Sequence, residues 1–213
     1  MKNILFLVLL YIISFSSNAQ TFVDDVERIA VVVIDYCVDE EGDRYNIKIN
    51  NDKSSYPNEG WRLGCLEHFK NGKLRYPMKM TNECWQSVYY FINSKYKTYK
   101  LPEGDQAICK TFHQGEYRYE NPAYSETTIS RRKNLQIEKD GYGGTQVYKI
   151  KWTDDHKYEL QAVKMSLEKD KHREKSTIAV EIIEVLNEKT YLYKAYFKDA
   201  EDSIPNFGLI TRI

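Results

Sequence analysis

Val147-Tyr148-Lys149-Ile150-Lys151-Trp152 alternates apolar or aromatic side chains with basic ones over most of its length. Successive side chains of a β-strand point to opposite faces, so the pattern predicts a strand with Tyr148, Ile150 and Trp152 on one face. A later segment repeats the alternation, with one face formed by Tyr191, Tyr193, Ala195 and Phe197. We therefore expect half-buried β-strands to decide the fold of the second half of the chain.

Six further segments surround these two and are also rich in β-branched and aromatic residues. The eight candidate strands cover 108–119, 126–131, 135–139, 147–152, 158–165, 177–186, 190–198 and 207–213. In the sixth of them the alternation slips by one residue after Ile182, which predicts a β-bulge. Short strands at such spacing are typical of an antiparallel sandwich or a small up-and-down barrel.

The first half of the chain predicts a smaller α+β unit. Residues 29–38 form a β-branched run that suits a strand buried on both faces, and 44–50 alternate as a second strand. Gly42 lies in the acidic turn between them, where a hairpin needs a positive φ. Near-helical apolar spacing predicts a helix over 59–69, and residues 84–92 read as a third strand. We expect this domain to span 20–100, with a linker at 101–107.

The order strand, turn, strand, helix, strand resembles the C-terminal domain of the TonB family. The segments that carry the resemblance are Val38-Asp39-Glu40-Glu41-Gly42, Asn46-Ile47-Lys48-Ile49 and Asn71-Gly72-Lys73. The chain departs from that family by its cysteines and by the lack of a proline-rich spacer, so an energy-coupling role is not expected. The resemblance implies a β-β-α-β fold that offers a sheet edge to an extended partner strand.

The second half resembles short exported bacterial proteins with a lipocalin-like barrel, some of which carry a topoisomerase label that an exported chain of this size does not justify. The matching segments are Cys109-Lys110, Phe112, Gly115, Tyr117, Tyr119, Ile129-Ser130-Arg131, Leu135-Gln136-Ile137-Glu138, Ile150 to Asp155 and Tyr158-Glu159-Leu160. The resemblance implies no established activity. The expected fold is thus mainly β with a small α+β part: a β-β-α-β domain followed by an antiparallel eight-strand barrel over 108–213.

Four cysteines, Cys37, Cys65, Cys84 and Cys109, allow three pairings into two disulfides. In the topology that the TonB resemblance implies, the third strand lies antiparallel to the first, which brings Cys37 to Cys84. The lipocalin-like proteins have a second cysteine just after the acidic turn, where this chain has His156. Cys109 then lacks a partner within the barrel, and we expect it to pair with Cys65.

The N-terminus has the three parts of a secretory signal peptide. Lys2 supplies a positive charge, residues 4–15 are almost entirely apolar, and Ser17-Asn18-Ala19 provides small residues for cleavage after Ala19. Residues 1–19 are therefore predicted to be removed, and the mature protein to be exported, either periplasmic or secreted. No second apolar segment approaches the roughly 20 residues needed to span a bilayer, so no membrane span is expected.

Charge and motifs narrow the function classes. Lys and Arg number 31, as do Asp and Glu, whereas nucleic-acid binding is expected to need a basic excess. Neither a nucleophile elbow nor a phosphate-binding loop occurs. The four histidines are scattered, and Asp154-Asp155-His156 is read as a turn, with a surface metal site as the alternative. We predict no catalytic residue, metal or cofactor, and an unrecognised hydrolase site is the least favoured reading.

The sequence thus predicts a non-catalytic binding or adaptor protein of the periplasm or cell envelope, with two open modes. In the first, the edge of the N-terminal sheet pairs with an extended segment of an envelope protein. In the second, the barrel carries a small apolar ligand. The candidate lining residues of such a cavity are Tyr148, Trp152, Tyr191, Tyr193 and Phe197. The same side chains could instead fill the barrel.

Overall fold

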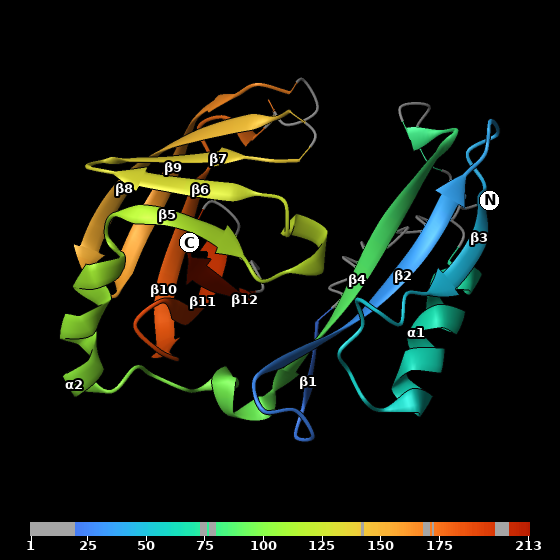
Figure 1. Cartoon of the computed structure of the whole chain (residues 1–213), viewed down its shortest axis with the longest axis horizontal. Helices are drawn as coiled ribbons and strands as arrows, with labels where there is room; N and C mark the ends of the chain where they lie inside the picture. The colour runs from blue at the N-terminus through green and yellow to red at the C-terminus, as the bar shows by residue number, and fades with distance from the viewer. Residues whose placement is uncertain are drawn as a thin grey trace, which may run out of the picture.

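The computed structural model describes residues 20–72, 76, 80–141, 143–167, 171, 173–198 and 205–213, so the predicted signal peptide lies outside the described residues. It contains a four-stranded sheet with one helix and a closed eight-stranded barrel (Figure 1). The predicted fold class is therefore confirmed. Within the described ranges, no helix is both long and apolar enough to cross a membrane.

The sheet has the order β1-β4-β2-β3. Its elements are β1 (Gln20–Val23), β2 (Ile29–Val38), β3 (Arg44–Ile49), α1 (Glu59–Asn71) and β4 (Glu83–Asn93). β2 pairs antiparallel with β3 and β4, which confirms the predicted β-β-α-β order, and β1 adds a parallel edge strand beside β4. Gly42 has a φ of +84° in the β2–β3 turn, as the hairpin pattern predicts.

The helix α1 closes one face of this sheet. The Asn58 side chain caps its first turn by accepting a hydrogen bond from the Trp61 backbone N–H at 3.2 Å. Cys65 and Phe69 are the buried residues of the helix, and they pack with Tyr36 of β2 in one hydrophobic core. The helix therefore stands where the spacing of its apolar residues predicts.

Cys37 and Cys84 lie directly opposite each other on β2 and β4 and form a disulfide, as predicted. The predicted second disulfide is wrong, because Cys65 and Cys109 are free and buried. Cys65 packs between α1 and the sheet, whereas Cys109 packs into the end of the barrel. Each thiol is thus enclosed in a separate hydrophobic core.

Burial raises the pKa of both free thiols to about 11, and for Cys109 the nearby Asp105 and Asp155 add to the rise. Since the thiolate is the reactive form, we expect a thiol reagent such as Ellman's reagent to leave the native protein unmodified over minutes. In denaturant the same reagent should titrate two thiols. A count of zero after unfolding would restore the Cys65–Cys109 pairing.

The barrel follows the cyclic order β10-β11-β12-β5-β6-β7-β8-β9. Its strands are β5 (Gly115–Tyr119), β6 (Thr128–Arg132), β7 (Leu135–Lys139), β8 (Thr145–Asp154), β9 (Lys157–Met165), β10 (Thr177–Val185), β11 (Thr190–Phe197) and β12 (Asn206–Arg212). The predicted bulge is present in β10, where the register shifts between Ile182 and Glu184. Ile182 consequently packs inside the barrel, while Ile183 packs into the core between barrel and sheet.

The segment before β5 differs from its prediction as a strand. Short helices α2 (Glu103–Gln106) and η3 (Ala107–Phe112) occupy it, and β5 begins only at Gly115. Cys109 and Phe112 of η3 are fully buried in a core with Leu101, which lies in the predicted linker. These apolar residues alternate poorly because they close one end of the barrel instead of forming part of its wall (Figure 1).

The sheet and the barrel share a hydrophobic core of their own. Ile92 at the end of β4 and Tyr96 of η2 (Ser94–Lys97) pack against Ile183, Leu192 and Phe207 of the barrel. Arg28 donates hydrogen bonds to Glu184 at 3.0 and 3.3 Å, and the Tyr96 hydroxyl donates to the same carboxylate. Apolar burial and the shared Glu184 carboxylate thus help to attach the barrel to the sheet.

Burial opposes ionisation of Glu184, but the hydrogen bonds from Tyr96 and Arg28 outweigh it and lower its pKa below the ordinary 4.5. We expect Glu184→Gln to reduce the free energy of unfolding by about 1–3 kcal/mol at pH 7. Because the folded pKa is the lower one, the loss should stay constant down to about pH 5 and shrink as the pH falls through the folded pKa. Thermal unfolding from pH 7 to 3 measures this.

The matched control is Glu188→Gln, since Glu188 is exposed in the turn after β10. It should leave the melting temperature within about 1 °C at every pH, as expected for a surface change well below 0.5 kcal/mol. A pH-independent loss at Glu184 would contradict the ionised pair.

Candidate ligand cavity of the barrel

The β6–β7 hairpin turns its polar residues toward the inside of the barrel. Arg131 and Gln136 are each 1% exposed and Glu138 is 8% exposed, whereas Leu135 on the same hairpin is 39% exposed. A strand usually buries its apolar face, so β7 has the reverse polarity, whereas β6 buries Ile129 on the same face as Arg131. The inverted pattern of β7 and Arg131 of β6 place a charged network inside a barrel whose other interior residues are mostly apolar or aromatic.

Arg131 is the largest fully buried side chain among the described residues. Its Nε donates to Gln136 Oε1 at 2.7 Å, its Nη2 to the Tyr158 hydroxyl at 2.8 Å and its Nη1 to the Phe112 carbonyl at 3.3 Å. The guanidinium carbon lies 4.9 Å from the ring centroids of Tyr117 and Tyr158. Hydrogen bonds and cation–π contacts together compensate the loss of hydration and fix the cation in place.

Gln136 connects this cation to a buried carboxylate. Its Nε2 donates to Glu138 Oε1 at 2.6 Å, and the Tyr119 hydroxyl donates to the same oxygen at 3.0 Å. Burial raises the pKa of Glu138, and the hydrogen bonds from Gln136 and Tyr119 and the charges of Arg131 and Arg173 offset part of that rise. The interior thus contains a cation and a carboxyl group held apart by one amide.

A cavity of about 1130 Å³ begins beside this network and continues into the groove between barrel and sheet. Its inner wall includes Gln136, Glu138 and Tyr158, and its outer part reaches Tyr90 and Gln86 of β4. Loop residues at the mouth come from the β5–β6, β7–β8 and β9–β10 connections, represented by Asn121, Asp140 and Arg173, and Asn206 lies there at the start of β12. The opposite end of the barrel holds η3 (Figure 1).

Three of the five predicted lining residues, Tyr148, Tyr193 and Phe197, do line the cavity. The other two lie toward the end that η3 fills. Tyr191 is fully buried with its ring 4.8 Å from Phe112, and Trp152 stacks on His113 at 3.6 Å. The aromatic row therefore both lines the cavity and fills part of the barrel.

The alternation missed the polar residues Arg131, Gln136, Glu138 and Tyr119, which form the most specific part of the site. On β7, Leu135 and Ile137 favour the opposite phase when the strand is read by apolar alternation, whereas Ile129 of β6 lies on the same inner face as Arg131. The signal that could have indicated a shared polar face is the pairing of Arg131 directly opposite Gln136 in the hairpin.

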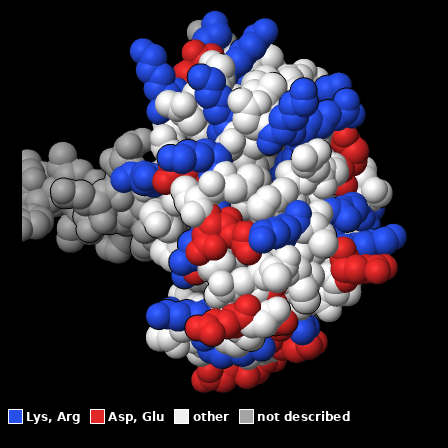
Figure 2. Space-filling model, turned by 90° about the vertical axis from the view of Figure 1, so that its left-hand side faces the viewer, with Lys and Arg blue, Asp and Glu red and all other residues white. Residues whose placement is uncertain are grey.

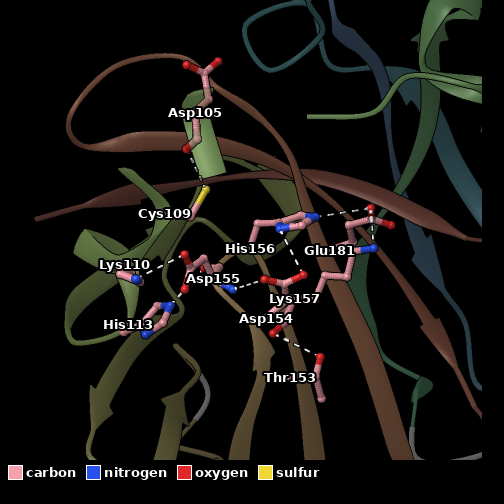
Figure 3. Close-up of polar contacts among 10 residues, drawn as sticks. All are labelled: Asp105, Cys109, Lys110, His113, Thr153, Asp154, Asp155, His156, Lys157 and Glu181. Carbon is pink, nitrogen blue, oxygen red and sulfur yellow. Dashed lines mark hydrogen bonds and ion pairs between the residues drawn. The ribbon is translucent and has the colours of Figure 1, made fainter. Parts of the chain in front are cut away.

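Asp155 and His156 form the β8–β9 turn directly after Asp154, the last residue of β8, so this segment is a turn, as predicted (Figure 3). The turn lies at the end of the barrel that η3 fills. Lys110 Nζ lies 3.2 Å from Asp155 Oδ2, and His113 Nε2 lies 2.9 Å from the Asp155 carbonyl oxygen. His156 is buried, 3.8 Å from Glu181 and 4.0 Å from Asp154. These contacts tie the turn to η3.

Within the ranges that the structure describes, no cluster of three or more His, Cys, Asp or Glu has the arrangement of a metal site. The outer surface of the barrel carries both signs of charge. On the face shown in Figure 2, basic side chains are more numerous toward the top and acidic ones toward the bottom. The barrel interior is therefore the candidate site that combines a cavity with buried ionisable groups.

The comparisons with known proteins found no match: no protein-family model, no curated protein and no solved structure is similar to the chain.

Proposed function

We propose that this chain is an exported, non-catalytic binding protein that holds a small ligand in its barrel cavity. The observation that carries the proposal is Glu138, a buried carboxylate on the wall of a cavity that measures about 1130 Å³ together with the groove between barrel and sheet. Ligand sites are typically clefts of about 300–1,000 Å³ with aromatic walls and a few placed polar groups. Tyr148, Tyr158 and Tyr193 supply aromatic walls here. The resemblance of residues 109–160 to exported lipocalin-like proteins agrees with this proposal.

A role in binding fits the network better than a role in catalysis. Glu138 receives its hydrogen bonds from an amide and a phenol, and Arg131 is held by Gln136, Tyr158 and a backbone carbonyl. General acid–base catalysis needs groups free to exchange protons with a substrate. A fixed cation and a fixed carboxylate instead suit recognition of a polar group.

The sheet edge is the second candidate, as an adaptor surface for an envelope protein. Among the described residues, β3 pairs only with β2, but its register with β2 contains a bulge, and Asn46 has a φ of 52° there. Bulges and charged side chains such as Lys48 are devices that protect edge strands from pairing. This geometry makes us favour the cavity over the sheet edge.

Filling the cavity should weaken binding. Ala195 lines the cavity from β11, and a phenylalanine there would occupy space that a ligand needs. We expect Ala195→Phe to weaken binding of the neutral aromatic probe N-phenyl-1-naphthylamine by about tenfold or more. A tenfold change corresponds to a loss of roughly 1.4 kcal/mol of binding free energy. Fluorescence titration of the purified protein measures the dissociation constant. Native mass spectrometry of protein from its own source then shows whether a molecule is retained.

The control is Val163→Phe, a change at a β9 residue that is 47% exposed and lies outside the cavity wall. Its dissociation constant should equal that of the unmodified protein. Equal binding by the Ala195→Phe protein, or no fluorescence change with the unmodified protein, would refute a ligand site in this barrel.

A further inference from the structure

The two carboxylate oxygens of Glu138 have different surroundings. Both hydrogen bonds to the group, from Gln136 at 2.6 Å and from Tyr119 at 3.0 Å, end on Oε1. Oε2 accepts no hydrogen bond from any described residue, although the side chain is more than nine-tenths buried on the cavity wall. Oε2 keeps some accessible surface, so it is open to a donor that enters the cavity.

The charge balance restricts what that donor can be. Arg131 lies one amide away from Glu138 and already supplies the compensating positive charge inside the barrel. Arg173 adds a second cation at the cavity mouth and also acts on Glu138. A cationic ligand would therefore enter against two fixed positive charges, and an anionic one would meet Glu138 itself.

The rest of the wall sets the shape and polarity of the ligand body. Tyr148, Tyr158 and Tyr193 line the inner part of the cavity together with Leu160 and Val180. Aromatic rings favour stacked or edge-on contact with another ring. A flat aromatic body suits these walls better than a strongly hydrated one, because desolvation of polar groups without partners is costly.

We propose that the ligand is a neutral aromatic molecule with a hydroxyl or N–H group that donates a hydrogen bond to Glu138 Oε2. This inference rests on the proposed function and adds the chemistry of recognition. The aromatic body packs among the tyrosines. The donor binds to Oε2, while Oε1 of the same carboxylate accepts the hydrogen bonds from Gln136 and Tyr119.

Isothermal titration calorimetry of the purified protein with a matched set of naphthalenes tests whether the ligand must donate a hydrogen bond. 2-Naphthol should bind about ten- to a hundredfold more tightly than 2-methoxynaphthalene, the range expected for one hydrogen bond to a charged acceptor. The ammonium ion of 2-naphthylmethylamine and the anion of 2-naphthoic acid should both bind more weakly than 2-naphthol. These comparisons use the unmodified protein and need no variant.

Glu138→Gln makes the test specific for the residue. The glutamine oxygen can still accept from Gln136 and Tyr119, which turns the new NH₂ group into the cavity in place of Oε2. The advantage of 2-naphthol over its ether should then vanish, and the acceptor 2-acetylnaphthalene should bind more tightly than it does to the unmodified protein. The control Glu159→Gln alters a carboxylate paired with Lys198 at 2.8 Å away from the cavity, and should keep the original preference.

The outcomes separate the two proposals. Binding of 2-naphthol and its ether with equal affinity, or tightest binding of the ammonium probe, would overturn the donor inference and leave the cavity as a ligand site. Failure of every naphthalene to bind would overturn the proposed function with it. If Glu138→Gln does not fold, the comparison of probes on the unmodified protein decides alone.

Discussion

Replacing Arg131 with methionine should lower the free energy of unfolding by about 3–5 kcal/mol, the cost of removing one member of a buried charged network. Methionine keeps most of the volume but leaves Gln136 Oε1, the Tyr158 hydroxyl and the Phe112 carbonyl without their donor. It also removes the larger of the two positive charges that offset the burial of Glu138 and leaves only that of Arg173. Urea denaturation followed by tyrosine fluorescence measures the loss, which corresponds to a fall in melting temperature of roughly 10 °C.

Two further variants show that the loss comes from the network. Arg132→Met changes the next residue, whose side chain is 82% exposed, and should cost less than about 0.5 kcal/mol. Adding Glu138→Gln to Arg131→Met should recover part of the stability, because the poorly compensated carboxylate is gone. If Arg131→Met and Arg132→Met were equally mild, the interior network would contribute nothing to folding.

Removing the disulfide by the double change Cys37→Ser and Cys84→Ser should cost about 4 kcal/mol, as the chain-entropy relation gives for a separation of 47 residues. The bond links the end of β2 to the start of β4. It therefore excludes unfolded conformations in which these two strand ends are far apart. Guanidinium unfolding of the two proteins under oxidising conditions measures the difference.

A reducing agent supplies the internal control for this experiment. Dithiothreitol should destabilise the unmodified protein by a similar amount and leave the serine variant unchanged, because Cys65 and Cys109 are already free. A further loss on reduction of the serine variant would reveal a second disulfide and contradict the separate burial of these thiols.

Much of the fold could be predicted because its signals are local. The eight strands, the bulge after Ile182, the turn at Gly42 and the helix that ends near Gly72 each follow from spacing within a few residues. Cys37 opposite Cys84 needed one topological assumption, namely an antiparallel third strand, and that assumption holds. Patterns of alternation and capping therefore sufficed for these elements.

The candidate site was harder to predict because its signals are long-range. Alternation gives the period of a strand but not which face is inside, and Leu135 and Ile137 suggested the wrong face for β7. Cys109 and Phe112 looked like part of a strand, although they belong to a short helix that fills the end of the barrel. Only closure of the barrel brings Arg131 to Tyr158 and to the Phe112 carbonyl.

The bulge in β10 has a consequence for how the two halves of the chain can exist. By shifting the register it buries Ile182 on the inside and Ile183 on the outside of the same wall, where Leu192 and Phe207 join it against the sheet. A barrel produced alone would expose these side chains to water as an apolar patch that favours self-association. The barrel is therefore expected to be expressed successfully only together with the sheet.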